Sequence, residues 1–301
     1  MSPKDNKHKS YTKTKNFMPK QVKTNKNEVA NVSLISDNRP LWSKYSYWIV
    51  FLLTFVLYGN TVFNDYALDD AIVITQNDYT QKGIAGIPDI FKNELFTGFF
   101  KVKKDLVAGG RYRPLSMLTF AIEVEFFGLN PHVSHFINVL LFAFLCLLLL
   151  FVLEKLFLQR FDAHTWFQHI PLLTTLLYLA HPIHSEVVAN IKGRDEIMSL
   201  LGALASFYFI LKAIEGKDKW INLLWVFICY LLAMLSKEIA TTFIVTIPLA
   251  LWFFTNAKFK TIFQTTLPLI VAAIIYFAIR QSVIGQEGIK TMPELMNDSF
   301  L

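Results

Sequence analysis

The sequence contains few charged residues for its length. Asp, Glu, Lys and Arg make up 17% of the 301 residues, whereas soluble globular domains carry roughly 25%. Hydrophobic residues account for 53% and aromatic residues for 15%, and the mean hydropathy is +0.40. A compact soluble domain keeps much of its surface polar and could not bury this much apolar surface. The composition therefore excludes an ordinary soluble protein and indicates a chain that lies in a lipid bilayer.

Cysteine is also scarce. Cys146 and Cys229 both lie inside long apolar stretches. Two isolated thiols provide neither a disulfide framework nor the ligand spacing of a metal site, so we expect buried thiols. No metal site is predicted from them, although a pair of adjacent aspartates, Asp69 and Asp70, leaves a divalent metal open. The chain also lacks an apolar stretch near Met1, so we expect no cleaved signal peptide.

Residues 1–45 are polar and rich in Lys, Asn, Ser and Thr. Such a segment cannot bury enough apolar surface to fold alone, and we predict a disordered tail. Its lysines contribute much of the net charge of +6. We interpret this charge as a signal of membrane topology that keeps the tail in the cytoplasm, and we expect no nucleic-acid partner.

Seven apolar stretches are predicted to cross the bilayer. Most contain about 16–22 residues, which suffices for a hydrocarbon core of ~30 Å at ~1.5 Å per residue. The stretch 169–181 is shorter and is expected to continue into the polar motif that follows it. The seven stretches are 47–63, 132–153, 169–181, 197–214, 220–235, 239–256 and 261–279. The sequence therefore predicts an all-α, multi-pass transmembrane helical bundle over residues 46–281.

An eighth apolar stretch, 114–129, contains Glu123 and Glu125. Each charge at the bilayer centre would cost roughly 2.5–3.5 kcal/mol, so we expect an amphipathic helix that lies flat at the membrane interface. It would belong to a long first extracytoplasmic loop, 64–131. Residues 282–301 would form a further extracytoplasmic loop in which the chain stops, as a truncated reading frame would.

The charges of the connections test this topology. With seven spans, the short connections 154–168, 215–219 and 257–260 all lie in the cytoplasm, and each contains two basic residues outside the spans. This agrees with the tendency of short cytoplasmic loops to carry Lys and Arg. If 114–129 crossed the membrane, the same basic connections would lie on the opposite side.

Four polar clusters fall on the extracytoplasmic side in this topology. Ionisable groups near membrane spans are retained where they act or pair, so their convergence predicts a functional site. The clusters are Asp69-Asp70, Gly109-Gly110-Arg111-Tyr112-Arg113-Pro114, the segment 181–196, which begins His181-Pro182-Ile183-His184-Ser185-Glu186, and Ser236-Lys237-Glu238.

Each cluster has a chemical and a structural interpretation. Two adjacent carboxylates repel each other, so one of Asp69 and Asp70 can serve as a base, but a helix cap or a solvated turn would use the same pair. The forked donors of Arg111 and Arg113 can bind a phosphate, or both side chains can extend to the membrane interface.

The histidine motif also has more than one interpretation. The spacing of His181 and His184 would suit a metal on a helix, but Pro182 favours a turn and no third ligand is evident. Hydrogen bonding to a substrate or to Glu186 is the preferred interpretation.

The last cluster also has two interpretations. Lys237 and Glu238 form a buried ion pair, or Lys237 faces an anionic head group. His135, in the first turn of the second span, is a weaker candidate.

In this order, the motifs resemble those of the transmembrane and tetratricopeptide-repeat O-mannosyltransferases and their bacterial relatives. These enzymes lie near the dolichyl-phosphate-mannose–protein mannosyltransferases in the GT-C class. The resemblance covers about residues 45–280. It is carried by Asp69-Asp70, Tyr112-Arg113-Pro114-Leu115-Ser116, Phe127-Gly128-Leu129-Asn130-Pro131 with His135 and Asn138, His181-Pro182-Ile183-His184-Ser185-Glu186, Gly193-Arg194-Asp195 and Leu235-Ser236-Lys237-Glu238.

The resemblance implies an inverting glycosyltransferase. It would move a sugar, by family default mannose, from a polyprenyl or dolichyl phosphate to a hydroxyl of a protein Ser or Thr or of a glycan. The reaction would take place on the periplasmic face of a bacterial inner membrane or in the lumen of the endoplasmic reticulum. In this scheme Asp69 is the base and Asp70 orients the acceptor or shares the proton.

The resemblance also implies roles for the other candidates. Arg111, Arg113, Arg194 and Lys237 would stabilise the leaving phosphate, and His181, His184 and Glu186 would line the sugar or phosphate pocket. His135, Asp195 and Glu238 are further candidates for the site.

Two other classes of protein remain as alternatives. A transporter or flippase for lipid-linked sugars would place polar residues in the middle of spans and show repeat symmetry, and neither is evident. A membrane scaffold without activity would keep the fold without the chemistry. The relatives usually have more spans followed by tetratricopeptide repeats, whereas this sequence has no internal 34-residue period. We therefore expect the acceptor-binding part to be absent from this chain, which adds a truncated, inactive fragment to the alternatives.

Overall fold

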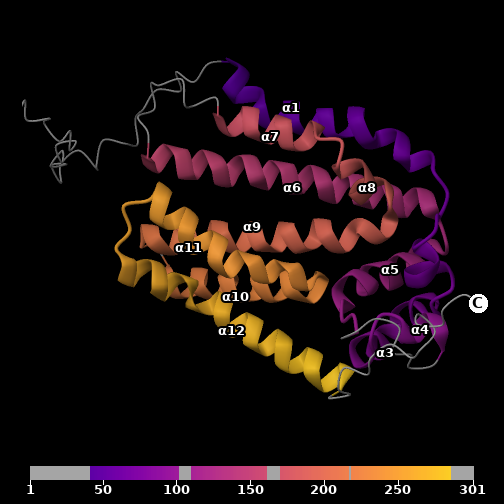
Figure 1. Cartoon of the computed structure of the whole chain (residues 1–301). Helices are drawn as coiled ribbons and strands as arrows, with labels where there is room; N and C mark the ends of the chain where they lie inside the picture. The colour runs from indigo at the N-terminus through magenta and orange to yellow at the C-terminus, as the bar shows by residue number, and fades with distance from the viewer. Residues whose placement is uncertain (1–40, 102–109, 161–169, 217, 286–301) are drawn as a thin grey trace, which may run out of the picture. The chain divides into compact units, whose positions relative to one another are not determined.

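The computed structural model describes residues 41–101, 110–160, 170–216 and 218–285 (Figure 1). The chain divides into two units, Met1–Lys44 and Tyr45–Leu301, and nearly all described residues belong to the second. These residues form helices and turns and no strand, which confirms the all-α class for the described part of the chain. Most of the predicted tail 1–45 and of the last loop 282–301 lies outside them.

Five helices are long and apolar enough to cross a membrane, judged by length and composition. They are α1 (Leu41–Tyr58) with η2 (Gly59–Phe63), α6 (Pro131–Arg160), η6 (Ile191–Gly193) with α9 (Arg194–Glu215), α10 (Lys219–Ser236) and α12 (Phe259–Ile284). The two other predicted spans form shorter apolar helices, α7 (Ile170–Ala180) and η7 (Glu238–Thr242) continued by α11 (Phe243–Phe254). With 11 residues, α7 measures only ~16 Å at ~1.5 Å per residue.

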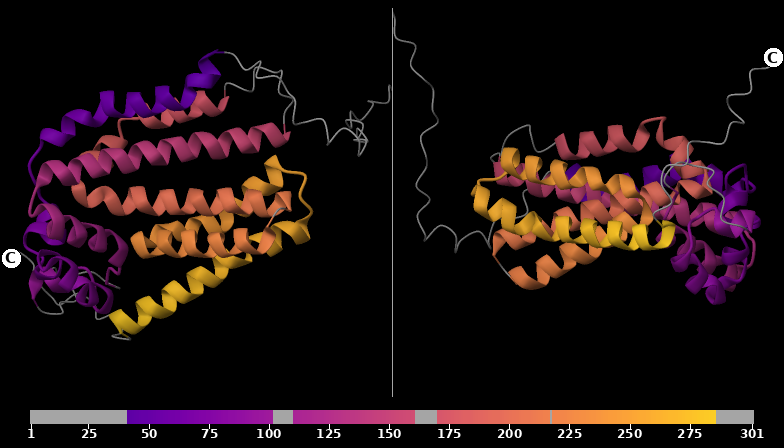
Figure 2. Two further views of the ribbon diagram at one scale, coloured as in Figure 1. Left: turned by 180° about the vertical axis from the view of Figure 1, so that it is seen from behind. Right: turned by 60° about the horizontal axis from the view of Figure 1, so that its bottom comes forward.

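These helices lie side by side in the unit that begins at Tyr45, as Figures 1 and 2 show. One buried core joins α9, α10, α11 and α12 through residues such as Phe207, Tyr230 and Tyr276. A second core joins α1, α6, α7 and α9 around Val50 and Phe142. The close contact of α9 with α10 depends on Gly202, because a Cβ there would lie 2.8 Å from the Cys229 carbonyl oxygen.

The predicted first loop, 64–131, is more ordered than a loop with one helix. It folds into short helices around a core of its own, which includes Val73, Ile90, Phe96 and Phe120. In both views of Figure 2 these helices gather at one end of the long helices. They are η3 (Ala71–Thr75, a π-helical turn), α2 (Asp78–Gln81), η4 (Gly83–Gly86), α3 (Ile87–Lys92), α4 (Thr97–Phe100) and α5 (Pro114–Phe127).

The helix expected at 114–129 is α5, which ends at Phe127 before Gly128, whose φ is +65°. Its two acids avoid hydrocarbon in different ways. Glu123 is buried and bound by an arginine, whereas Glu125 is exposed and accepts the backbone N–H of Ile84 at 3.0 Å. The helix therefore docks on the protein through a charged residue, which its apolar sequence pattern did not indicate.

Candidate functional site

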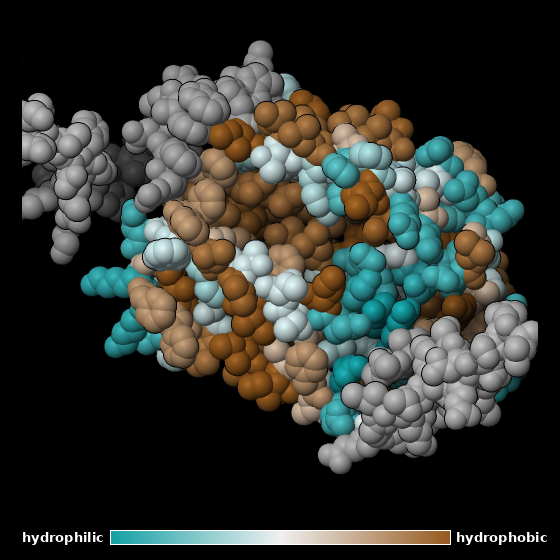
Figure 3. Space-filling view, viewed as in Figure 1, coloured by the Kyte–Doolittle hydropathy of each residue, from teal (hydrophilic) through white to brown (hydrophobic). Residues whose placement is uncertain are grey.

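All four predicted polar clusters meet at the beginning of α9. Figure 3 shows hydrophilic side chains gathered on this part of the surface, beside the apolar helices. Because the contacts join residues far apart in the sequence, the site exists only in the folded chain. The ion pairs that connect the clusters are Lys192–Asp69, Arg113–Asp195, Arg113–Glu238 and Lys237–Glu196, with N···O distances of 3.1, 2.8, 2.7 and 2.6 Å.

The other end of α9 is polar as well. There Glu215 pairs with Lys155 from the end of α6. The 22 residues of α9 separate the two ends by ~33 Å at ~1.5 Å per residue. The four clusters thus share one end of the helical bundle, as the charge pattern predicts. The side of a membrane that this end faces stays a prediction.

The two adjacent aspartates have different surroundings. Asp70 is 1% exposed, and its carboxylate accepts the backbone N–H groups of Ala67 and Lys192, both at 3.0 Å. The Asp69 carboxylate is half exposed and is held by the Lys192 ammonium. Burial raises the pKa of Asp70, and the two backbone hydrogen bonds offset part of this effect. Asp70 therefore anchors the turn, and Asp69 presents its carboxylate to the site.

The turn before these aspartates has an unusual backbone. Leu68 has φ of +37°, a region that residues with a Cβ seldom adopt, and its side chain is 93% exposed. The hydrogen bond from Ala67 to Asp70 closes this turn. An exposed leucine in such a conformation indicates that the position of the carboxylates, and not the packing of Leu68, determines the shape of the turn.

Arg113 is the centre of a buried charge group. Its Nε and Nη2 donate to the two carboxylate oxygens of Glu238 at 3.1 and 2.7 Å, and its Nη1 donates to Asp195 at 2.8 Å. The side chain is only 7% exposed. Its backbone is fixed nearby, because the Tyr276 hydroxyl of α12 donates to the Tyr112 carbonyl at 3.0 Å. Arg113 thus links the first loop to α9 and to the start of η7.

Arg194 uses all its donors within the protein. The side chain is fully buried, and its guanidinium lies 4.4 Å from the centre of the Phe120 ring. In this position it joins α5 to α6 and α9 and does not face an open space, so it is not placed to contact a leaving phosphate directly. Its acceptors are the side chains of Asn138, Thr119 and Glu123 and the carbonyl of Ser134.

Lys237 and Glu238 do not pair with each other. The backbone of Lys237 is extended, with φ of −158° and ψ of 133°, so the two neighbouring side chains diverge. Lys237 donates to Glu196, and Glu238 accepts from Arg113. The alternative of a buried ion pair between these two neighbours was therefore wrong, although each of them does form an ion pair.

The remaining predicted residues are less closely engaged. The Arg111 guanidinium lies 5.5 Å from the Phe96 ring and has no acidic partner among the described residues. His181 and Glu186 are exposed. His135 is 1% exposed, and its Nδ1 has no hydrogen-bond partner within the described part of the chain. No group of three or more His, Cys, Asp or Glu in that part is arranged to hold a metal ion.

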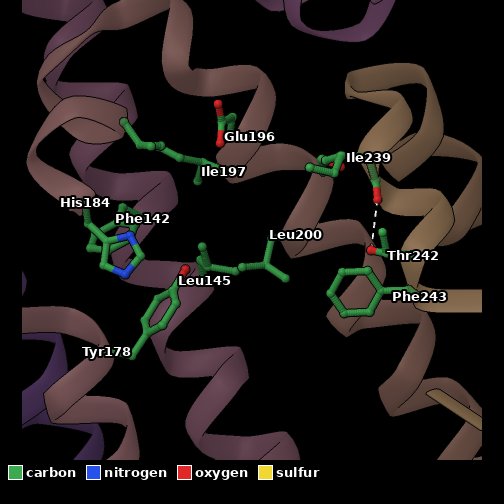
Figure 4. Close-up of a pocket in the computed structure, with 12 residues that line it drawn as sticks. Phe142, Leu145, Tyr178, His184, Glu196, Ile197, Leu200, Ile239, Thr242 and Phe243 are labelled. Atoms are coloured by element: carbon green, nitrogen blue, oxygen red, sulfur yellow. Dashed lines mark hydrogen bonds between the residues drawn. The ribbon is translucent and has the colours of Figure 1, made fainter. Parts of the chain in front are cut away.

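A cavity of about 260 Å³ adjoins the charged residues. Its walls are mainly apolar and come from α6, α7, α8 (His184–Ala189), α9, η7 and α11. Figure 4 shows His184 and Tyr178 on one side, with ring centres 4.2 Å apart, and Thr242 and Phe243 on the other. Glu196, the partner of Lys237, also lines it.

Two residues of the site had no role assigned to them from the sequence. Lys192 holds the aspartate pair, and Glu196 holds Lys237. Both lie in the predicted cluster 181–196, on either side of Asp195. Their position at the polar start of a long apolar helix could have indicated them, but their partners lie 123 and 41 residues away in the sequence.

The fold and the site define a helical membrane protein with acids and cations gathered beside an apolar cavity. No family model and no solved structure matches the chain. It is 30% identical to human protein O-mannosyl-transferase TMTC1 over 150 residues, and 30% identical to mouse TMTC4 over 214 residues. These alignments cover 50% and 66% of this chain, and 16% and 28% of the relatives.

A fruit-fly relative, protein O-mannosyl-transferase Tmtc1, is 29% identical over 191 residues, which are 63% of this chain and 21% of that protein. The chain is therefore a distant homologue of the TMTC protein O-mannosyl-transferases, which confirms the resemblance of the motifs. It spans less than a third of the length of these three relatives.

Proposed function

We propose that this chain is the membrane part of an inverting GT-C glycosyltransferase. It moves a sugar, mannose or one like it, from a polyprenyl or dolichyl phosphate to a hydroxyl of a protein or glycan. One observation carries the proposal. The half-exposed Asp69, the cations Lys192, Arg113 and Lys237, and an apolar cavity lie together in a single cluster. The relatives are named for transfer of mannose to protein, which supports the choice of sugar and acceptor.

The cavity and the lysines fit an amphiphilic donor. A polyprenyl phosphate needs an apolar site for its chain and donors for its phosphate. The cavity supplies the first, and Lys237, next to its wall residue Glu196, supplies the second. The carboxylate partners of Lys192 and Lys237 are each 48% exposed, so a phosphate can replace them on the lysines without leaving a buried charge unpaired.

The reaction then follows from the position of Asp69. Its carboxylate takes the proton of the acceptor hydroxyl while the acceptor oxygen bonds to C1 of the sugar from the face opposite the phosphate. The bond between C1 and the phosphate oxygen breaks, and the lipid phosphate leaves with both electrons of that bond. Lys192, Lys237 and Arg111 stabilise the negative charge that develops on the phosphate.

The buried residues support this site without contacting the reacting atoms. Asp70 fixes the turn that presents Asp69. Arg113, with Asp195 and Glu238, holds the first loop against α9 and η7. Arg194 fixes α5. His184 lines the donor cavity. His181, Glu186 and His135 lie near these elements, and we assign them to the surroundings of the sugar and the acceptor.

The proposed topology has seven spans. The five long helices cross the membrane completely, and the shorter helices α7 and η7–α11 complete their spans with the polar residues that follow or precede them. The N-terminus is cytoplasmic, and the site faces the bacterial periplasm or the lumen of the endoplasmic reticulum. Because the ion pairs of the site lie at helix ends, the arrangement disfavours a transporter, which would place them in mid-span.

The test is a sugar-transfer assay on membranes that contain the protein. The probe is polyprenyl phosphate carrying radiolabelled mannose, and the measurement is label transferred to protein. Asp69→Asn should reduce the rate about 100-fold or more, because a general base contributes roughly 10²–10⁴-fold. Asp65→Asn, at an exposed acid four residues before Asp69, is the matched control and should keep the rate. Equal rates for both variants would exclude Asp69 as the base.

A further inference from the structure

A second apolar groove lies at the end of the bundle opposite the candidate site. It has a volume of about 590 Å³ and runs between α10 and α12. The two helices run parallel here, since residues near the start of α10 line the groove together with residues in the first half of α12. Its apolar floor includes Leu224, Phe227, Leu267 and Val271. Its volume lies within the ~300–1,000 Å³ range of ligand sites.

The mouth of this groove is basic. Lys219 lines it, and among the described residues its ammonium donates only to the neutral amide oxygen of Gln264, at 3.5 Å. Lys260 lies one helical turn before Gln264 on α12, and Lys258 is the residue before that helix begins. None of these three lysines forms an ion pair within the described residues. The mouth of the groove therefore carries three lysines that no described acid pairs with directly, although Asp218 precedes Lys219 in the chain.

Trp220 marks the depth of the groove in a bilayer. It lines the groove and is 81% exposed, and it lies beside Lys219 at the start of α10. Exposed tryptophans of membrane proteins concentrate at the level of the lipid head groups. The lysines would then lie at the phosphate level, while the apolar floor extends into the acyl-chain region.

We propose that this groove binds an anionic phospholipid. The phosphate contacts Lys219 and Lys260, and one acyl chain lies along Leu224, Phe227 and Leu267. Charge complementarity favours this occupant over a zwitterionic lipid, because each lysine near an anionic head group is worth roughly a fivefold change in binding. The proposal concerns the end of the bundle opposite the candidate site and does not depend on glycosyltransferase activity.

The test uses the fluorescence of Trp220. The protein is reconstituted in phosphatidylcholine nanodiscs with the five other tryptophans replaced by phenylalanine. A minor fraction of the lipid is brominated, either phosphatidylglycerol or phosphatidylcholine, because bromine quenches tryptophan on contact. Brominated phosphatidylglycerol should quench Trp220 at several-fold lower mole fraction. A variant that keeps only Trp252, which is 67% exposed on α11, is the control and should show no preference.

The lysine variants separate charge from hydrophobic contact. Lys219→Gln with Lys260→Gln should abolish the preference while leaving quenching by brominated phosphatidylcholine, whereas Lys219→Arg with Lys260→Arg should keep it. Equal quenching by both brominated lipids in the protein with native lysines would overturn the proposal. So would protection of Trp220 from both lipids, since a second copy or another protein would then cover the groove.

Discussion

Lys192 binds both aspartates of the candidate site through different atoms. Its ammonium holds Asp69, and its backbone N–H holds Asp70. A side-chain substitution therefore affects the exposed carboxylate and leaves the anchor of the buried one in place. This separation makes Lys192 more informative for mutagenesis than the aspartates themselves.

We expect Lys192→Ala to lower sugar transfer about 10- to 100-fold with little effect on stability. The half-exposed carboxylate loses its fixed position and the leaving phosphate loses one donor, whereas a partly exposed ion pair contributes only ~1 kcal/mol to folding. Lys192→Arg should recover part of the rate. The measurement combines initial transfer rates with thermal unfolding in detergent. A large fall in unfolding temperature would assign Lys192 a structural role.

Asp70 predicts a pH dependence of stability. Its pKa in the folded protein is raised, mainly by burial, above the ordinary value of 3.8. Between those two values the folded state binds more protons than the unfolded state, so the Asp70 contribution to the free energy of unfolding decreases as the pH rises. This stabilising contribution is complete below pH 3.8 and is lost as the pH rises through the higher pKa that Asp70 has in the folded protein.

The comparison is between the native protein and Asp70→Asn, which does not titrate at this position. We expect the unfolding temperature of the native protein, relative to that of the variant, to fall as the pH increases from 4 to 8. Other groups titrate in both proteins and cancel in the difference. A difference that is constant over this range would contradict the raised pKa.

At the scale of elements, α5 connects the first loop to the bundle through one buried ion pair. Glu123 accepts from Arg194, which also binds residues of α6. Removing one partner of a buried pair leaves an uncompensated charge and typically destabilises a protein by ~3–5 kcal/mol. The docking of α5, and with it the position of Arg113 just before this helix, therefore depends on a residue remote from the proposed chemistry.

Glu123→Gln should lower the unfolding temperature in detergent and make the first loop sensitive to proteolysis. Glu125→Gln on the same helix is the matched control, because Glu125 is exposed. It should behave like the native protein. If both variants unfold at the same temperature as the native protein, the pair does not hold the loop. Combining Glu123→Gln with Arg194→Gln should restore part of the loss, since no unpaired charge then remains.

The elements were predicted from the sequence to different extents. Long apolar stretches determine a helix locally, and the seven predicted stretches all contain helix. The helix content of the loop 64–131 was underestimated. Its short helices are stabilised by contacts between residues distant in the sequence, such as Asn77 and Leu95, and not by a periodic pattern of their own. Similarly, the pairing of Arg113 with Glu238 joins residues 125 apart, which one sequence cannot reveal.

At the scale of the whole molecule, the charged residues gather at the two ends of the helical bundle, and this separation supports the proposed topology. The site residues lie at the beginning of α9, and the pair of Lys155 with Glu215 lies near its other end. Both short basic connections that the structure describes, around Lys219 and Lys258, belong to that second end. This segregation was predictable from the sequence, because apolar helices of membrane length place consecutive connections on alternate sides.

Membrane sidedness is therefore the test of the whole arrangement. In a protein whose two cysteines are replaced by serine, single cysteines at Leu68 and Ser185 should react with a membrane-impermeant maleimide from outside sealed cells. A cysteine at Phe259 should react only after the membrane is opened. All three side chains are exposed on the surface of the protein. If Leu68 and Ser185 label from opposite sides, the aspartates and the histidine motif cannot share a site, and the transferase mechanism fails.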